Sequence, residues 1–247
     1  MEEFLKNWYG ILAFVAFDVI ALAVIICITY RWAFKRIFDA FISTICIVVL
    51  SPLYAVIVTR ALLAKKRGEL KSVLKGENFV GKKGKVVKLL SFESKNTDGE
   101  IACKYGEWIA KTGLYKTALF FDIFLGKLSF VGCKALKESD CAFLTDEEDD
   151  RHIAKIGLIN PLVISNAEQT DYEDMLVSDI KYAEKFSFGL DCKIFFTWLL
   201  KTVRGEGEGY LGSVKTTSYA DELLKDNRIT QADYDEAKKQ DEEQKLE

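Results

Sequence analysis

Two long apolar segments occupy the N-terminal part of the chain, and the polar positions around them set its organisation. The first segment covers residues 8–29, which is long enough to cross a hydrocarbon core of ~30 Å at ~1.5 Å per residue. Aromatic residues mark both of its ends, as is typical of membrane interfaces: Trp8, Tyr9, Tyr30 and Trp32. Basic residues follow the segment, whereas its leading flank holds a single lysine. The pattern predicts a transmembrane helix with the N-terminus outside and the remaining chain cytoplasmic.

Asp18 lies inside this first apolar segment. An ionisable group at membrane depth usually faces protein or loses its charge. Asp18 is therefore a candidate contact for a partner helix, and a protonated Asp18 facing lipid is the alternative.

The second apolar segment runs from Lys35 to Arg67 and carries basic residues at both ends. A straight helix over its apolar part would rise ~42 Å, so length permits a tilted span. Cationic flanks prefer the cytoplasm, however, so both ends favour the same side of the membrane. Pro52 removes a backbone donor near the middle, and the Ser51 hydroxyl is placed to bond a carbonyl left unpaired there. The pattern predicts a re-entrant helix-break-helix hairpin, with a kinked spanning helix as the alternative.

The remaining chain mixes shorter patterns, which predict a small cytoplasmic α/β domain. Alternating and β-branched positions predict a strand at 86–92, and a broad apolar face predicts one helix over 108–125 that ends at Gly126. Amphipathic helices are expected at 172–186 and 190–203, and the second fits either a buried core or a membrane interface. Glycines at 205–212 predict a flexible link. The pattern of the tail from Ser218 predicts two short helices with Thr230 as an N-cap. Its segment ITQADYDEAKK resembles a short bacterial oligomerisation motif.

The predicted fold class is therefore α+β and mostly helical. We expect an anchor at 1–33, a membrane hairpin at 34–67, a cytoplasmic domain at 68–204 and a linker with a helical tail at 205–247.

Composition narrows the classes of function. The chain is 49% hydrophobic and 29% charged, which fits a membrane anchor joined to one polar domain. A formal charge of -3 gives no indication of nucleic-acid binding, and membrane lipid is the expected partner surface. The six cysteines lack a C-x-x-C spacing, which is typical of reduced thiols, and the single His152 cannot build a histidine-rich metal site.

Six motifs in order make the chain similar to a known family: KRIFD, LSP, VGKKGKVVKLLSF, LGKLSFVG, RHIAKIGL and LDCKIFF. Over residues 34–204 it resembles the monotopic phosphoglycosyltransferases, the bacterial sugar transferases that move a phosphosugar from a nucleotide diphosphate sugar onto polyprenol phosphate. The resemblance implies a bacterial cytoplasmic (inner) membrane location and the re-entrant hairpin. Its hairpin positions are Lys35, Arg36, Asp39, Ser51 and Pro52.

The residues that carry the family's chemistry are not all present in this sequence. The family has an Asp-Glu pair that supplies the nucleophile and helps hold magnesium, and the corresponding positions here are Tyr115 and Lys116. A cation at a magnesium ligand position repels the metal. Asp122 is the only carboxylate in the predicted helix beyond that point, and no Asp-Glu pair occurs between Lys104 and Gly132. No catalytic residue of the family is intact, and neither a metal nor another cofactor is expected.

Other positions of the implied pocket have also changed. The residues expected to be arginine, arginine and tryptophan are Phe79, Glu93 and Pro161. Lys134 keeps the expected charge but lacks the planar fork that grips a phosphate. Lys134 and Arg151 remain the candidate substrate-binding residues.

These observations favour a catalytically defective homologue that acts as partner, regulator or scaffold of an active phosphoglycosyltransferase, or that associates with itself. An active transferase with a rearranged site, using Tyr115 or Asp122 and Mg²⁺, is the alternative. Binding of lipid or nucleotide sugar without turnover, through Lys134 and the basic turn at 82–88, is a third interpretation.

Overall fold

A computed structural model describes residues 8–29, 34–95, 101, 103–164, 172–204 and 218–243. The predicted interface residues Tyr30 and Trp32 and the predicted flexible link lie outside this described part. The α-helices are α2 (Trp8–Thr29), α3 (Lys35–Lys66), α4 (Lys104–Thr112), α5 (Leu119–Leu125), α6 (Glu138–Cys141), α7 (Asp146–Asp149), α8 (Tyr172–Lys185), α9 (Phe188–Val203), α10 (Tyr219–Lys225) and α11 (Gln231–Glu243). The strands are β1 (Leu74–Val80), β2 (Val86–Phe92), β3 (Ser129–Val131) and β4 (Gly157–Ile159). Short 3₁₀ helices are η2 (Lys82–Gly84), η3 (Leu114–Ala118), η4 (Asp150–Ile153) and η5 (Pro161–Ile164). This is the predicted mostly helical α+β class.

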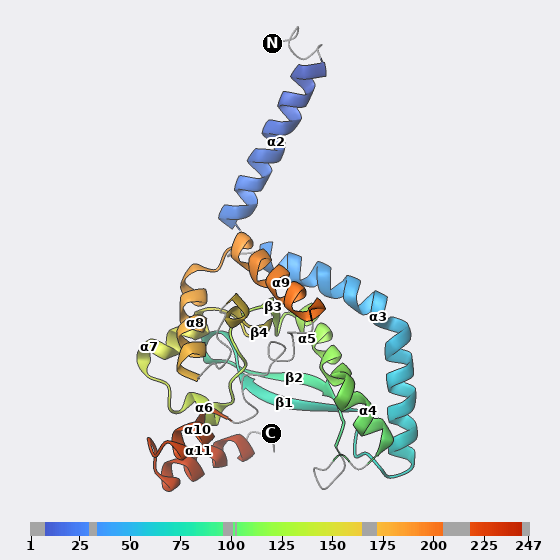
Figure 1. The fold of residues 1–247 in the computed structure, drawn as a ribbon, viewed down its shortest axis with the longest axis vertical. Coiled ribbons are helices and arrows are strands. Elements are labelled where there is room, and N and C mark those ends of the chain that lie inside the picture. The colour runs from blue at the N-terminus through green and yellow to red at the C-terminus, as the bar shows by residue number, and fades with distance from the viewer. Residues whose placement is uncertain are drawn as a thin grey trace.

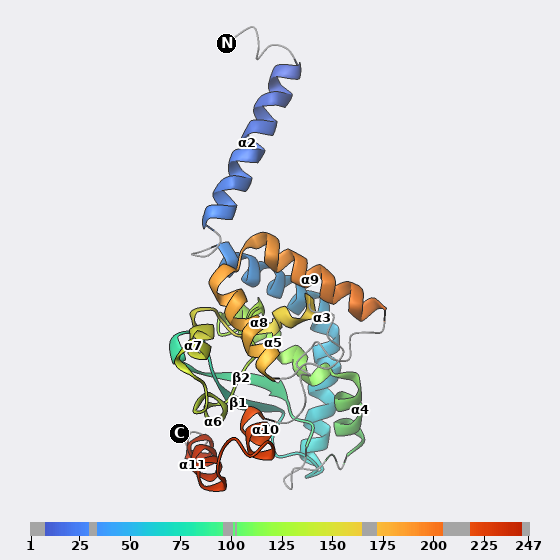
Figure 2. The ribbon, with the colours of Figure 1, turned by 60° about the vertical axis from the view of Figure 1, so that its left-hand side comes forward.

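Helix α2 projects from one end of the body (Figures 1 and 2). Its large apolar side chains are exposed, for example Phe14 at 57% and Phe17 at 68%. A helix that is apolar on all sides has no water-facing stripe, so these side chains require lipid or protein around them. The predicted helix forms, and its passage across a membrane stays a prediction.

Helix α3 is one continuous helix with Pro52 inside it, so the predicted break is absent. Figure 1 shows instead that α3 bends part-way along its length. Proline lacks one N–H and its ring crowds the preceding turn, which is enough to kink a helix whose neighbours still favour helical structure. Ser51 is exposed, and its hydroxyl forms none of the hydrogen bonds found among the described residues, contrary to our prediction.

The part of α3 before Pro52 (the first limb) and the part after it (the second limb) pack on the same body. The buried residues of α3 recur every three or four positions on each side of Pro52, at Asp39 and Ser43 before it and at Tyr54, Ile57, Ala61 and Ala64 after it. The opposite face is apolar and exposed, with Phe41 at 64% and Val49 at 68%. Helix α3 is long and apolar enough to cross a membrane by length and composition, which is consistent with membrane association.

Strands β1 and β2 form an antiparallel hairpin around η2, in register from Leu74 opposite Phe92 to Val80 opposite Val86. The sequence predicted β2 but not β1, because the polar residues of β1 hide its alternation. Strands β3 and β4 form a separate parallel pair.

The single helix predicted over 108–125 is wrong. The structure has α4, then η3, then α5, because Gly113 adopts a left-handed conformation with φ of 68° and ends α4. Glycine enters this region without a steric penalty. The apolar pattern continues across the interruption, which is why periodicity alone missed it.

Helices α8 and α9 form as predicted, and α9 lies beside the first limb of α3 (Figures 1 and 2). The tail forms the two predicted helices. Thr230 accepts from the Asp233 N–H at 3.3 Å, as expected of an N-cap. Both tail helices lie at the end of the body away from α2 (Figure 1), and Tyr219 and Leu223 of α10 are buried in a hydrophobic cluster with Tyr172, Met175 and Leu176 of α8.

Candidate functional site

Tyr115 and Lys116 lie next to each other on η3, where both are half-buried. Burial is the main reason that the pKa of the Tyr115 phenol is raised, and Glu77 raises it further. Burial also lowers the pKa of the Lys116 ammonium, whose nitrogen lies 5.6 Å from the centre of the Tyr115 ring. A protonated phenol beside an amine offers no carboxylate oxygen at either position.

Helix η3 is fixed against the second limb of α3. The Tyr54 hydroxyl donates to the carbonyl of Thr117 at 2.9 Å, and Ala118 is 1% exposed. Tyr115 and Lys116, which correspond in position to the family's acidic pair, therefore belong to an element that is packed against α3.

Asp122 follows in α5, with no exposed surface. Its Oδ2 accepts from the backbone N–H of Leu90 at 2.6 Å, and the Lys127 ammonium lies 3.2 Å from its Oδ1. The carboxylate thus links α5 to β2. A nucleophile has to reach its substrate, and an enclosed carboxylate does not.

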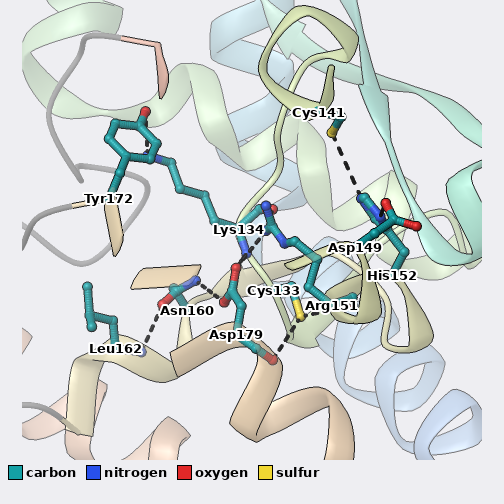
Figure 3. A network of polar contacts seen from close by, with 10 residues as sticks. All are labelled: Cys133, Lys134, Cys141, Asp149, Arg151, His152, Asn160, Leu162, Tyr172 and Asp179. Atoms are coloured by element: carbon teal, nitrogen blue, oxygen red, sulfur yellow. Dashed lines mark hydrogen bonds and ion pairs between the residues drawn. The ribbon is translucent and has the colours of Figure 1, made fainter. Parts of the chain in front are cut away.

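The two candidate substrate-binding residues, Arg151 from η4 and Lys134, which follows β3, lie around a buried carboxylate (Figure 3). The Arg151 guanidinium donates to Asp179 Oδ2 at 2.6 Å and to the backbone carbonyl of Lys134. The other Asp179 oxygen accepts from the Asn160 amide at 2.9 Å. Arg151 is 1% exposed and Asp179 has no exposed surface. Burying two charges is unfavourable unless they pair, and this geometry pairs them.

Two guanidinium nitrogens of Arg151, Nε and Nη1, are buried without a hydrogen-bond partner among the described residues. Buried donors without a partner in the protein can be satisfied by an ordered water molecule or an ion. Their enclosure means that a ligand reaches them only if the surrounding chain opens.

The Lys134 ammonium points toward Tyr172 of α8 (Figure 3). It donates to the Tyr172 hydroxyl at 3.2 Å and lies 4.4 Å from the centre of the ring. Burial lowers the pKa of this ammonium to about 8. Tyr172 in turn packs against Tyr219 of α10, with ring centres 5.3 Å apart. Helix α10 of the tail therefore packs against Tyr172, the side chain that Lys134 contacts.

The other changed positions have structural roles. Phe79 packs against the main core, and Pro161 is buried at the start of η5. Glu93 accepts from the N–H groups of Ser94 and Lys95, both at 3.1 Å, and so closes the end of β2. His152 is 8% exposed and lies 2.8 Å from Asp149, in keeping with a packing role.

The hairpin positions also find partners in the body. The Lys35 ammonium donates to the Val131 carbonyl at 3.0 Å, to the Tyr182 hydroxyl at 2.8 Å and to Asp191. Asp39 accepts from the Ser129 hydroxyl at 2.7 Å. Sequence reasoning named these residues but not their partners, because the partners follow many residues later without a motif that links them.

Asp18 is exposed on α2. The structure places it away from the body, and its predicted contact with a partner helix stays a prediction.

Comparison with known proteins adds one finding. The family model of the bacterial sugar transferases matches residues 30–205 of the 247, which includes α3, both strand pairs, and α8 and α9. No curated protein matches the chain. The match covers more than half of the sequence, and the chain belongs to the bacterial sugar transferase family.

Proposed function

We propose that this chain is a non-catalytic member of the family that acts as partner, regulator or scaffold of an active phosphoglycosyltransferase in membrane glycan assembly. The observation that carries the proposal is the pair Tyr115 and Lys116 at the positions of the family's Asp-Glu pair. A raised phenol pKa keeps Tyr115 protonated at neutral pH, which makes it a weak nucleophile.

The residues present do not fit the magnesium ion that the resemblance implies. Magnesium takes carboxylate, phosphate and water oxygens in an octahedral arrangement. Lys116 offers an amine, and the described part of the chain contains no group of three His, Cys, Asp or Glu side chains placed to hold a metal. The buried position of Asp122 also argues against its use as a replacement nucleophile.

A re-entrant course of α3 is part of this proposal. Lys35 at the start of α3 contacts Asp191, and Tyr54 in the second limb contacts Thr117, so both limbs hold the same body. A helix with one end on each side of a membrane could not keep both contacts. In a variant whose six native cysteines are replaced by serine, single cysteines at Glu69 and at Lys6 separate the two topologies by membrane-impermeant labelling in intact cells. We expect Glu69→Cys to be protected and Lys6→Cys to be labelled, and labelling of both would exclude the re-entrant course.

The proposed partner role rests on the exposed side chains of α2. Helix α2 exposes its apolar side chains and Asp18 along its length, and a second helix that hydrogen-bonds Asp18 would remove an unfavourable charge from lipid. The tail is less available for self-association, because Tyr219 and Leu223 are already buried in its own domain.

The decisive experiment combines recovery of partners with an assay of chemistry. The tagged full chain is isolated from native membranes in mild detergent, and the proteins recovered with it are identified. The chain separated from those proteins is then tested for nucleoside monophosphate release from a panel of nucleotide diphosphate sugars with polyprenol phosphate and Mg²⁺. We expect no release by the chain alone and stoichiometric recovery of a homologue that retains the Asp-Glu pair.

Tyr115→Phe and Asp122→Asn make the assay specific. Magnesium-dependent release by the purified wild type that either substitution abolishes would overturn the proposal in favour of a rearranged active site. Full activity gained by Tyr115→Asp with Lys116→Glu would show that the rest of the pocket still supports transfer, and would argue against a long-standing loss of function.

A further inference from the structure

A basic cavity lies at the start of α3, where this helix meets the turn at η2 and the chain leading into β4. Its volume is about 250 Å³, and four cationic side chains line it together with one carboxylate: Lys35, Arg36, Lys82, Lys155 and Asp39. Four positive charges and one negative charge give the lining a formal charge of +3.

Only one of the four cations has a carboxylate partner within ion-pair distance among the described residues. That cation is Lys35, which pairs with Asp191. Arg36 donates to the carbonyl of Ile123 at 2.9 Å and to that of Phe124, and Lys155 donates to the carbonyl of Gly126 at 2.8 Å. Carbonyl groups orient these side chains but carry no net charge. The excess positive charge of the cavity is therefore not neutralised by these contacts.

The Asp39 carboxylate, already counted in the formal charge of the lining, accepts hydrogen bonds from neutral donors. One of its oxygens accepts from the Ser129 hydroxyl at 2.7 Å and the other from the Phe130 N–H at 3.3 Å. With Asp191 added to the sum, the cavity and its immediate ion pair still carry +2. Burial lowers the pKa of Lys155. The cations Arg36, Lys82 and Lys35 lower this pKa further, and the Asp39 carboxylate opposes them. An anion in the cavity would relieve this repulsion.

The side chains that line the cavity retain the donors an anion requires. An arginine offers five N–H groups and a lysine offers three, so Arg36 and Lys155 keep donors beyond those used on carbonyls. The fork of a guanidinium matches the oxygens of a phosphate. Glycine at position 126 is what admits Arg36 here, because a Cβ on that residue would lie 2.7 Å from the Arg36 Nε.

The cavity also lies at the end of the apolar helix α3. Ile37, two residues after Lys35, is 61% exposed on the apolar face of α3. Lipid phosphates lie at the boundary between hydrocarbon and water, where basic side chains beside an apolar helix meet them.

We propose that this cavity binds a phosphate group, carried either by a lipid headgroup or by a free phosphate. The site uses Arg36, Lys82 and Lys155 as its contacts and Lys35 as a fixed cation beside them. It stands apart from Tyr115 and Lys116, and the proposal does not depend on whether the chain catalyses a transfer.

The test uses the full chain purified in a non-ionic detergent. Thermal unfolding and native mass spectrometry follow binding of three probes: inorganic phosphate, dioctanoyl phosphatidylglycerol and dioctanoyl phosphatidylcholine. We expect phosphatidylglycerol to stabilise the chain in a salt-sensitive manner and phosphatidylcholine to have a much smaller effect. Stabilisation by inorganic phosphate at similar concentrations would identify a free phosphate as the ligand.

Lys82→Gln is the primary variant, because Lys82 is exposed and its ammonium contacts no carboxylate in the described part of the chain. Lys155→Gln is the second variant, and its unfolding temperature without ligand shows whether the fold survives. Lys85→Gln is the matched control, since Lys85 is an exposed lysine beside the same turn but does not line the cavity. We expect each of the first two variants to weaken binding by about tenfold and Lys85→Gln to leave it within about twofold.

Two results would overturn the proposal. One is no stabilisation of the wild type by either anionic probe. The other is an equal loss of binding in Lys82→Gln and Lys85→Gln, which would mean attraction to a diffuse basic surface and no defined cavity site.

Discussion

At the scale of single residues, Asp122 is a buried carboxylate with a structural role. It is fully buried, accepts from the Leu90 N–H and faces the Lys127 ammonium. Removing it leaves the partly buried Leu90 N–H without its acceptor, which typically costs about 1–3 kcal/mol.

We therefore expect Asp122→Ala to lower the free energy of unfolding by about 1–3 kcal/mol, measured by denaturant titration in detergent. Asp174→Ala is the matched control, because Asp174 is an exposed residue of α8, and it is expected to change stability by less than about 0.5 kcal/mol. Similar losses in both variants would contradict the structural role of Asp122.

Lys134 predicts a specific dependence of stability on pH. Its pKa is lowered by burial from 10.5 to about 8. Between these values the unfolded chain keeps a proton that the folded chain has released, so stability rises with pH. The free energy of unfolding of the wild type, minus that of Lys134→Met, should increase from about pH 8 to pH 10.5. A flat or falling difference would show that Lys134 is not buried against Tyr172.

At the scale of elements, the docking of α10 and α11 combines the buried side chains of α10 with polar contacts to α6. Asp140 accepts from the Ser218 hydroxyl and, at 3.1 Å, from the Ala220 N–H. Asp241 accepts from the Ser139 N–H at 3.1 Å and from its hydroxyl at 2.6 Å. These bonds hold two short helices that would be unstable alone.

Asp140→Ala is expected to accelerate hydrogen exchange of the α10 and α11 amides about tenfold, without a comparable change in α8, because the tail opens independently when its anchor is lost. Arg228→Ala is the control. Its ion pair with Glu173 joins side chains that are 52% and 58% exposed, and such pairs contribute little. Equal exchange in α10 and α8 would mean that the tail and the body open as one unit.

The elements also show what the sequence could and could not predict. Helices α8, α9, α10 and α11 were predictable because each has an amphipathic period or a capping residue within its own length. Strand β1 was not, since half of its residues are polar and its identity comes from pairing with β2. In the site, the change at Tyr115 and Lys116 was visible from spacing. The enclosure of Arg151 by Asp179 was not, because 28 residues separate the two and no local pattern reports the contact.

At the scale of the whole molecule, Lys35 joins α3 to three other elements. It contacts Val131 in β3, Tyr182 in α8 and Asp191 in α9. Breaking a buried ion pair by removing one partner costs about 3–5 kcal/mol, because the remaining charge is left uncompensated.

We expect Lys35→Met to lower the midpoint of thermal unfolding by roughly 6–20 °C, and the double variant Lys35→Met with Asp191→Leu to recover part of that loss. Lys75→Met is the control, since its pair with Glu77 joins side chains that are 44% and 37% exposed, and a drop of at most a few degrees is expected. Strict additivity of the two single substitutions would show that the pair does not couple α3 to α9.

The same pair has a consequence during biosynthesis. Lys35 and Asp191 are 156 residues apart, and a ribosome adds about 5–20 residues per second. For roughly 8–30 s after Lys35 is made, its counter-ion does not yet exist. During that interval the exposed apolar face of α3 would aggregate in water. We therefore expect the nascent chain to deliver this helix to the bilayer before the body that contacts Lys35 has been synthesised.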